Sequence, residues 1–290
     1  MHLSLGTAQW GRGYGVTNTR GSLSDDDVAA IVETALGFGI QHVDTHRSSS
    51  PEQGYGDAQS RLRPWADAFS ITTKVYGSAA ADRLVSDQLA ASLGELGVTS
   101  VRACLVHDWS TLNDREAALS ASLLAQAQES GMVDAIGISA YDEHDIERAA
   151  SFFDQIGALQ VPLNVLDQRL CTNSTLQGLR SAGARIQVRS VFLQGLLADA
   201  TASTPLGRHP DIVAFHDACH DRDIAPLDAC LSFVRSVPWV DEVVVGVTSA
   251  AELSQIAEAW NTESAPLDWS AMASTNVDLL DPRRWATMQA

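Results

Sequence analysis

The sequence has little cysteine, few basic residues and no long apolar run, and each shortage excludes a class of protein. The four cysteines form no CxxC pair, which argues against a disulfide-stapled domain and is typical of reduced thiols. Only 19 Lys and Arg stand against 36 Asp and Glu, a net charge of −17, whereas nucleic acids and anionic membranes are bound by clustered basic residues. No apolar run approaches the roughly 18 residues that span a bilayer, and we read no signal peptide at the N-terminus. We therefore expect a cytoplasmic protein that binds neither nucleic acid nor a membrane.

Short apolar runs alternate with amphipathic stretches from one end of the sequence to the other. Several of the short runs are almost continuously apolar, which is typical of strands covered on both faces. The eight predicted strands are Leu3–Gln9, His42–His46, Phe69–Lys74, Val101–His107, Asp134–Ala140, Ala158–Leu163, Arg185–Val191 and Glu242–Thr248. Helix-like stretches lie between them, such as Ala81–Leu96, Glu116–Gln128 and Ala250–Trp260. This alternation favours parallel strands joined by crossover helices.

The number of strands favours one closed barrel over an open doubly wound sheet. A (β/α)8 barrel has eight strands and about 250 residues, which suits this chain of 290 residues. No Pro-, Gly- or Ser-rich linker divides the chain, and no short repeat is visible. We predict an α/β protein with a single TIM-barrel domain over residues 1–290, in which residues 262–290 form a C-terminal loop and tail.

Polar residues follow most of the predicted strands at the point where each strand ends. Asp44 and His46 end the second strand, Lys74 ends the third and His107 ends the fourth. The next three strands end near Ser139, Gln160 and Arg189. Because the carboxyl ends of barrel strands meet at one mouth, where barrel enzymes have their active sites, we expect these side chains to converge. A Lys after a buried strand usually needs a carboxylate partner, and Asp44 on the neighbouring strand is the natural candidate for Lys74.

The order of these residues resembles the aldo-keto reductase family. Asp44-Thr45, then Tyr55-Gly56, then Lys74 and His107 after successive strands carry the resemblance. Further similar segments are Gly6–Trp10, Gly137–Ser139, Leu159–Asn164, Arg189–Leu197, Gly246–Ser249 and Asp281–Arg283. Each motif is weak by itself, but their shared order extends over nearly the whole chain.

The resemblance implies an NAD(P)H-dependent oxidoreductase that reduces an aldehyde or ketone to an alcohol, with Tyr55 as the proton donor. A phenol has a pKa near 10, too high for easy proton exchange at neutral pH. The resemblance therefore gives Lys74 the role of stabilising the phenolate, and gives Asp44 the role of holding Lys74. A neutral His107 would orient the substrate oxygen. The expected partner is a small-molecule carbonyl compound, with a sugar-like or polyol carbonyl as one candidate.

The resemblance also assigns residues to the cofactor, NADPH or NADH, and to the substrate pocket. The polar side chains after the fifth and sixth strands would hold the nicotinamide carboxamide, and the loop after the seventh strand would lie along the pyrophosphate. The helix that opens at Ser249 would present its positive end to a phosphate. The cofactor set is Ser139, Gln160, Asn164, Arg189, Ser190, Leu193, Gly195, Thr248, Ser249, Glu252 and Gln255. The predicted pocket residues are Trp10, His46 and Trp109.

One departure from the family pattern concerns the proton donor. Tyr55 follows Asp44 by eleven positions, and residues 46–54 include an apparent insertion where the family usually has a shorter stretch. We expect the insertion to bulge outward and leave Tyr55 in the site, since the residues after it continue in the family's register. If it reshapes the loop instead, His46 or another tyrosine would face the substrate. The other tyrosines are Tyr14, Tyr76 and Tyr141.

Two further departures concern the cofactor. Many members hold the 2′-phosphate with Lys or Arg in the last turn, but residues 247–256 contain no basic residue and have Glu252 about where an Arg would serve. A carboxylate repels a phosphate and can accept a hydrogen bond from a free ribose hydroxyl, which favours NADH use or relaxed choice. An Arg from another loop, such as Arg208, could restore phosphate binding. Arg189 stands where many members place an aromatic residue, and its guanidinium can stack as a plane or reach a phosphate.

Two other functions stay open on the sequence alone. An aldo-keto reductase-like barrel with a non-redox or regulatory role would also suit the insertion and the missing base. A metal-dependent barrel lyase, isomerase or hydrolase would use Asp44, His46, His107 and Asp108 as ligands. Lys74 among these groups would repel a cation, so we expect no metal. We expect a monomer or a small homo-oligomer.

Overall fold

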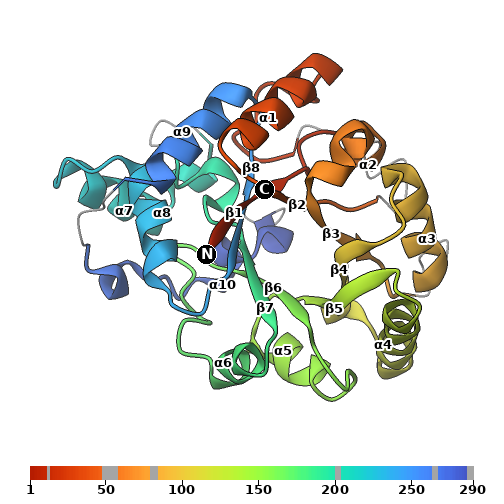
Figure 1. Ribbon diagram of the computed structural model, residues 1–290. Coiled ribbons are helices and arrows are strands. Elements are labelled where there is room, and N and C mark those ends of the chain that lie inside the picture. The colour runs from red at the N-terminus through yellow and green to blue at the C-terminus, as the bar shows by residue number, and fades with distance from the viewer. Residues whose placement is uncertain (12–13, 48–57, 79–83, 200–203, 263–266, 286–290) are drawn as a thin grey trace.

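Eight parallel strands close into a barrel, and helices surround it (Figure 1). The computed structural model describes residues 1–11, 14–47, 58–78, 84–199, 204–262 and 267–285. The strands are β1 (His2–Gly6), β2 (His42–Asp44), β3 (Ser70–Val75), β4 (Val101–Val106), β5 (Val133–Ser139), β6 (Ala158–Pro162), β7 (Arg185–Arg189) and β8 (Glu242–Gly246). Each overlaps the run predicted for it, and β1 pairs in parallel with both β2 and β8. The predicted TIM barrel is therefore confirmed.

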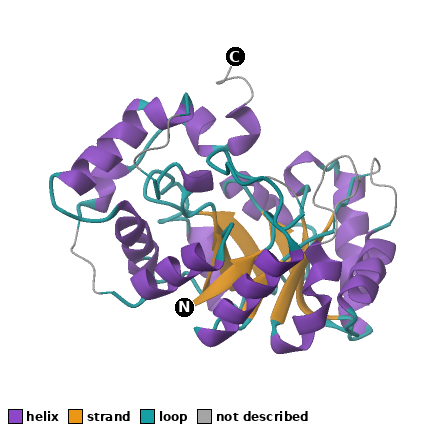
Figure 2. Cartoon of the chain, turned by 90° about the horizontal axis from the view of Figure 1, so that it is seen from above, coloured by secondary structure: helices purple, strands orange, loops and turns teal. Residues whose placement is uncertain are grey.

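The helices occupy the connections between the strands and cover the barrel from outside (Figure 2). They are α1 (Asp25–Gly37), α2 (Ala58–Leu62), α3 (Val85–Leu96), α4 (Asp114–Glu129), α5 (Glu143–Ala149), α6 (Ser174–Ser181), α7 (Pro210–His220), α8 (Pro226–Ser236), α9 (Ala250–Trp260) and α10 (Val277–Leu280). In the predicted C-terminal tail, α10 lies between short 3-10 turns at Trp269–Met272 and Pro282–Arg284. None of the described helices combines the length and the apolar character needed to cross a bilayer.

The helix ends are fixed by side chains that the sequence places there. Ser24 caps α1 by accepting a hydrogen bond from the backbone N–H of Asp27, and the Asp27 carboxylate accepts one from the Ser24 N–H in return. Asn113 and Glu116 form the same reciprocal pair at the start of α4. Such caps satisfy backbone donors that a helix leaves unpaired, and each contributes about 1 kcal/mol.

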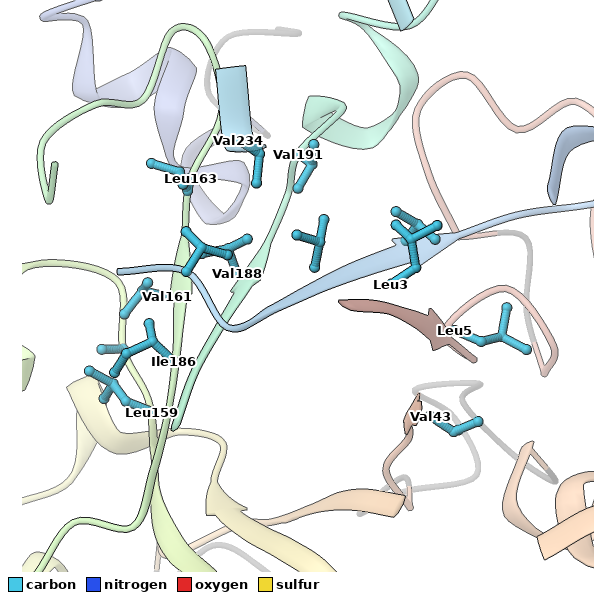
Figure 3. Close-up of a cluster of buried hydrophobic side chains, with 14 of the residues drawn as sticks. Leu3, Leu5, Val43, Leu159, Val161, Leu163, Ile186, Val188, Val191 and Val234 are labelled. Carbon is cyan, nitrogen blue, oxygen red and sulfur yellow. The ribbon is translucent and has the colours of Figure 1, made fainter. Parts of the chain in front are cut away.

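The main apolar core lies between the strands and the surrounding helices. Successive strand residues point to opposite faces, so one set faces the helices and the other faces the barrel interior. Figure 3 shows part of the outward set, which includes Leu3, Leu5, Val43, Leu159, Val161, Ile186 and Val188, all of them buried. A small separate apolar cluster, formed by Ala103, Leu105 and Ala158, comes from the alternate strand positions. Much of the remaining interior is polar, and this positions the site described next.

Candidate active site

A cavity of about 730 Å³ is lined by residues at the carboxyl ends of the strands and in the loops that follow them. We call it the mouth cavity. Eleven of the residues predicted for the site line it: Asp44, His46, Lys74, His107, Gln160, Arg189, Ser190, Gly195, Thr248, Glu252 and Gln255. We call the part around Lys74 and His107 its catalytic end, and the part around Thr248 and Glu252 its β8 end. The strand-end side chains therefore converge as expected.

The buried ammonium of Lys74 is paired with Asp44. Its Nζ lies 2.5 Å from Oδ1 and 2.6 Å from Oδ2 of the Asp44 carboxylate. The Lys74 side chain is 5% exposed and that of Asp44 is 13% exposed, so water screens the pair little. The pairing predicted from the two neighbouring strand ends is confirmed. It holds the ammonium in the cavity wall in one position.

Asp44 is also anchored by a chain of hydrogen bonds that crosses the barrel interior. Gln160 Nε2 donates to Asp44 Oδ1 at 2.8 Å and lies 3.2 Å from Gln187 Oε1. Gln187 Nε2 in turn donates to Thr72 Oγ1 at 2.8 Å and to Glu242 Oε1 at 2.9 Å. Glu242 begins β8, at the opposite end of the barrel from the mouth, and it is paired there with the Arg102 guanidinium. A connected chain of polar side chains therefore holds the Asp44 carboxylate from inside the barrel, on the side away from the mouth.

Two buried histidines lie against each other at the catalytic end. The rings of His46 and His107 have centroids 5.2 Å apart, and the Tyr76 ring meets His107 edge-on at 5.2 Å. Burial, aided by the Lys74 charge, lowers the pKa of His46 to about 3. Burial also holds the pKa of His107 well below its usual value, and protonation of His46 and the charges of Lys74 and Arg189 act in the same direction. Both imidazoles are therefore neutral at pH 7, as the expected orienting role of His107 requires.

The neutral histidines make stability depend on pH. As the pH falls through 6.5, the unfolded chain takes up a proton at His46 and the folded chain does not, because its pKa is about 3. This contribution to stability is complete above pH 6.5 and is lost as the pH falls toward 3. Between pH 8 and pH 5 we expect the free energy of unfolding to fall by about 2 kcal/mol through His46, and further through His107. Urea unfolding at a series of pH values measures the slope, and an equally steep slope in His46→Gln/His107→Gln would contradict this origin.

The structure describes three of the four tyrosines. Tyr55, the predicted proton donor, lies outside the described residues. Tyr14 and Tyr141 line the mouth cavity. Tyr76 contacts both buried histidines through its ring, and its backbone N–H and C=O are bound by the Gln88 side-chain amide at 2.9 and 2.8 Å. Tyr76 is therefore the described phenol that touches His107.

The loop after β7 has a backbone that few side chains adopt. Ser190, Leu193 and Gln194 have φ values of 61°, 44° and 54°, in the left-handed region. Thr17 Oγ1 donates to the Gln194 carbonyl at 3.0 Å, and a Cβ on Gly195 would stand 2.0 Å from that hydroxyl oxygen. Glycine is therefore required at 195. Strained backbone of this kind concentrates at ligand-binding sites, and this is the loop predicted to lie along the pyrophosphate.

At the β8 end, the Glu252 carboxylate has a structural partner. Its two oxygens accept hydrogen bonds from the Thr248 N–H at 2.6 Å and the Thr248 hydroxyl at 2.7 Å, while Ser249 caps α9. Arg20 lines the same end of the cavity, and its Nη1 donates to the Thr248 carbonyl at 2.9 Å. The basic residue at this end of the cavity is therefore Arg20, whereas Arg208 is absent from the described cavity lining. Sequence reasoning missed Arg20 because it belongs to an irregular loop between β1 and α1.

Several predicted residues lie behind the cavity wall. Asn164 binds backbone, accepting from the Leu166 and Asp167 N–H groups and donating to the Ser190 carbonyl. Ser139, Leu193 and Ser249 are also absent from the described lining of the mouth cavity.

The two tryptophans predicted for the substrate pocket lie in the apolar core. Trp10 and Trp109 are fully buried, and neither belongs to the described lining of the mouth cavity. The Trp109 indole donates to the Asp145 carbonyl at 3.1 Å and packs against Phe152 and Phe153. A sequence position just after a strand predicts at which end of the barrel a residue lies. It does not predict the direction of the side chain, because the chain turns there and the side chain can face the core.

The described residues also bear on the metal alternative. Among them, no group of three or more His, Cys, Asp or Glu side chains is arranged to hold a metal ion. Asp108, one of the ligands considered, accepts hydrogen bonds from the Gly77 and Ser78 N–H groups at 2.7 and 3.1 Å. The Asp44 carboxylate is held by the Lys74 ammonium.

Comparison with known proteins agrees with this architecture. The sequence pattern of the aldo/keto reductase family matches residues 2–276. A D-threo-aldose 1-dehydrogenase from a Pseudomonas species is 25% identical over an alignment of 312 positions, which covers 91% of this chain and 93% of that protein. The solved glycerol dehydrogenase from Gluconobacter oxydans is 18% identical with a TM-score of 0.69, covering 96% of this chain and 90% of that one. An aldo-keto reductase from Bacillus halodurans is 14% identical with a TM-score of 0.70, covering 97% and 92%. The two solved structures share the fold, and the family match over nearly the whole sequence shows that this chain belongs to the aldo/keto reductase family.

Proposed function

We propose that the protein is an NAD(P)-dependent oxidoreductase that interconverts a carbonyl compound and an alcohol, with Tyr55 as the proton donor. The observation that carries the proposal is the buried Lys74–Asp44 pair beside the neutral His107 in the mouth cavity. A fixed ammonium favours the phenolate form of a nearby tyrosine, so that the phenol can release and regain its proton. A neutral imidazole can hydrogen-bond a substrate oxygen without competing for the proton.

The residues around the cavity suit a nicotinamide cofactor. The Gln9 amide oxygen is buried in the cavity wall with no hydrogen-bond partner among the described residues, so it can accept from a ligand amide. The left-handed backbone at Ser190 and Gln194, which both line the cavity, gives it a place suited to a phosphate group. When bound, the cofactor supplies the hydride. In this proposal Lys74, fixed by Asp44, favours the phenolate of the proton donor, and His107 orients the substrate oxygen.

For the substrate we propose a sugar-like or polyol compound. The 25% identical relative is named for the dehydrogenation of an aldose, and that match covers most of both chains. Polar side chains from several loops, such as Asp199, also line the cavity and suit a compound with several hydroxyl groups. The amides of Asn18 and Gln194, which line it as well, are bound to neighbouring loop residues.

Direct binding and turnover test the proposal. The purified protein should show a change in tryptophan fluorescence and a higher melting temperature with NADH or NADPH at up to millimolar concentration. It should then oxidise aldoses or polyols with NAD(P)⁺, or reduce aldehydes with NAD(P)H. Binding without turnover on a broad panel would favour the non-redox alternative, and failure of both cofactors to bind would refute the redox function.

Arg20 is proposed to decide between the two cofactors. Its guanidinium lies at the β8 end, where it donates to the Thr248 carbonyl and lies near the Asp27 carboxylate. Its side chain is 49% exposed and its nearest carboxylate, Asp27, is 3.4 Å away, so a 2′-phosphate can compete for it. We expect Arg20→Gln to weaken NADPH about 5- to 10-fold and NADH less than twofold, as for a partly screened charged hydrogen bond.

Adenosine fragments give a readout of Arg20 that does not depend on turnover. The affinity for 2′,5′-ADP should fall in Arg20→Gln, while that for 5′-AMP stays the same. Arg208→Gln is the matched control, and it should change neither affinity. A loss of 2′,5′-ADP binding in the Arg208 variant alone would move the phosphate site to that residue.

A further inference from the structure

The catalytic end of the mouth cavity contains a cation with no carboxylate partner. Arg189, the last residue of β7, lines the cavity, and its Nη2 donates to the Ala140 carbonyl at 3.0 Å. Its guanidinium carbon lies 4.2 Å from the centroid of the Tyr141 ring. No Asp or Glu of the described residues lies within 4.0 Å of it. The Ala140 carbonyl, the Ser190 hydroxyl at 3.4 Å from Nη1 and the Tyr141 ring orient the group, but none of them carries a compensating negative charge.

The neighbouring cations are, by contrast, each neutralised. The Lys74 ammonium contacts both oxygens of Asp44. Arg283, which lies 3.5 Å from the centroid of the same Tyr141 ring, binds Asp281 through Nε at 2.9 Å and Nη2 at 2.7 Å. Since the two histidines are neutral, Arg189 is the one of these three cations whose charge no contacting carboxylate matches.

A charge in this place matters for hydride transfer, and here the inference rests on the proposed function. In carbonyl reduction, a hydride, which is one proton and two electrons, leaves the dihydronicotinamide for the carbonyl carbon, and the oxygen takes a proton from the donor. The nicotinamide ring changes from neutral to +1. The reacting carbonyl must lie at the catalytic end, and the Arg189 charge acts there, since it contributes to lowering the pKa of His107.

We propose that Arg189 makes the site discriminate against the oxidised, cationic form of the nicotinamide. A fixed, partly buried cation disfavours a second positive charge nearby. The reduced cofactor then binds more tightly than the oxidised one, and the bound oxidised cofactor becomes a stronger hydride acceptor. Arg189 thereby shifts the equilibrium between the enzyme-bound reactants toward the carbonyl compound and reduced cofactor, which is the direction of alcohol oxidation.

Equilibrium binding of the two redox forms tests this without any turnover. Dissociation constants for NADH and NAD⁺ are measured by fluorescence titration or calorimetry on wild type, Arg189→Gln, Arg189→Lys and the surface control Arg222→Gln. We expect the ratio Kd(NAD⁺)/Kd(NADH) to fall about 10-fold in Arg189→Gln, equivalent to about 1.4 kcal/mol. Arg189→Lys keeps the charge and should keep most of the ratio, and Arg222→Gln should not change it.

Each other outcome has a distinct meaning. An equal loss of affinity for NADH and NAD⁺ in Arg189→Gln would overturn the proposal and identify Arg189 as a phosphate ligand. An unchanged ratio with unchanged affinities would overturn it as well, while leaving the proposed function intact. If wild type binds neither form, the proposed function fails, and this inference fails with it. Melting curves of both Arg189 variants confirm that the compared proteins are folded.

Discussion

Tyr55→Phe is expected to lower kcat/KM for carbonyl reduction by about 1000-fold, since a positioned general acid contributes about 10²- to 10⁴-fold. The variant loses one oxygen and keeps the ring, so cofactor affinity should change by less than twofold. The reason lies in what surrounds the catalytic end. The Lys74 ammonium and the neutral His107 are in place to serve a proton donor, and the Asp44 carboxylate is already engaged with Lys74.

Tyr76→Phe is the matched control for this prediction. Tyr14 and Tyr141 line the mouth cavity, whereas Tyr76 is the described tyrosine whose ring contacts His107, so that contact makes Tyr76 an alternative donor to test. We expect Tyr76→Phe to change kcat/KM by less than 10-fold, because Tyr76 is absent from the described lining of the mouth cavity. Loss of activity in Tyr76→Phe with Tyr55→Phe active would transfer the role to Tyr76. Near-normal activity in both variants would refute proton transfer by either residue.

The fold was predictable because its signals are local and repeated. Strands such as β8, whose outward residues pack on helices, appear as continuous apolar runs, and capping residues such as Ser24 mark where helices begin. The convergence of Asp44, Lys74 and His107 followed from topology, since all parallel strands end at the same mouth. The helix α2 is only five residues long, too short to show a period.

Other parts of the site depend on information that a single strand does not carry. In the sequence, Gln187 and Glu242 look like ordinary strand residues. The pairing of β7 with β8 and the closure of the barrel bring them into the hydrogen-bonded chain that ends at Asp44. Arg20 reaches Thr248 across 228 positions of sequence. Trp10 follows β1 at the expected end of the barrel but packs in the apolar core, because the direction of a side chain after a strand depends on the turn that follows.

The polar chain across the barrel gives the Lys74–Asp44 pair its importance for stability. Asp44 is held from one side by Lys74 and from the other by Gln160, so removing the ammonium leaves a largely buried carboxylate without its counter-charge. Breaking a buried ion pair by removing one partner costs about 3–5 kcal/mol. The same change should remove the charge that favours the phenolate. Stability and catalysis are therefore expected to fail together in a single variant.

Lys74→Met should accordingly lower the free energy of unfolding by about 3 kcal/mol or more, and lower kcat/KM at least about 1000-fold. The double variant Asp44→Asn/Lys74→Met separates the two effects, because it removes the unpaired carboxylate but does not restore the ammonium. We expect its free energy of unfolding to return to within about 1–2 kcal/mol of wild type, since neutral pairs of similar volume replace buried ion pairs with little loss. Its kcat/KM should stay as low as that of Lys74→Met. Recovery of activity together with stability would show that Lys74 serves only to compensate Asp44, and the ammonium would then have no part in proton transfer.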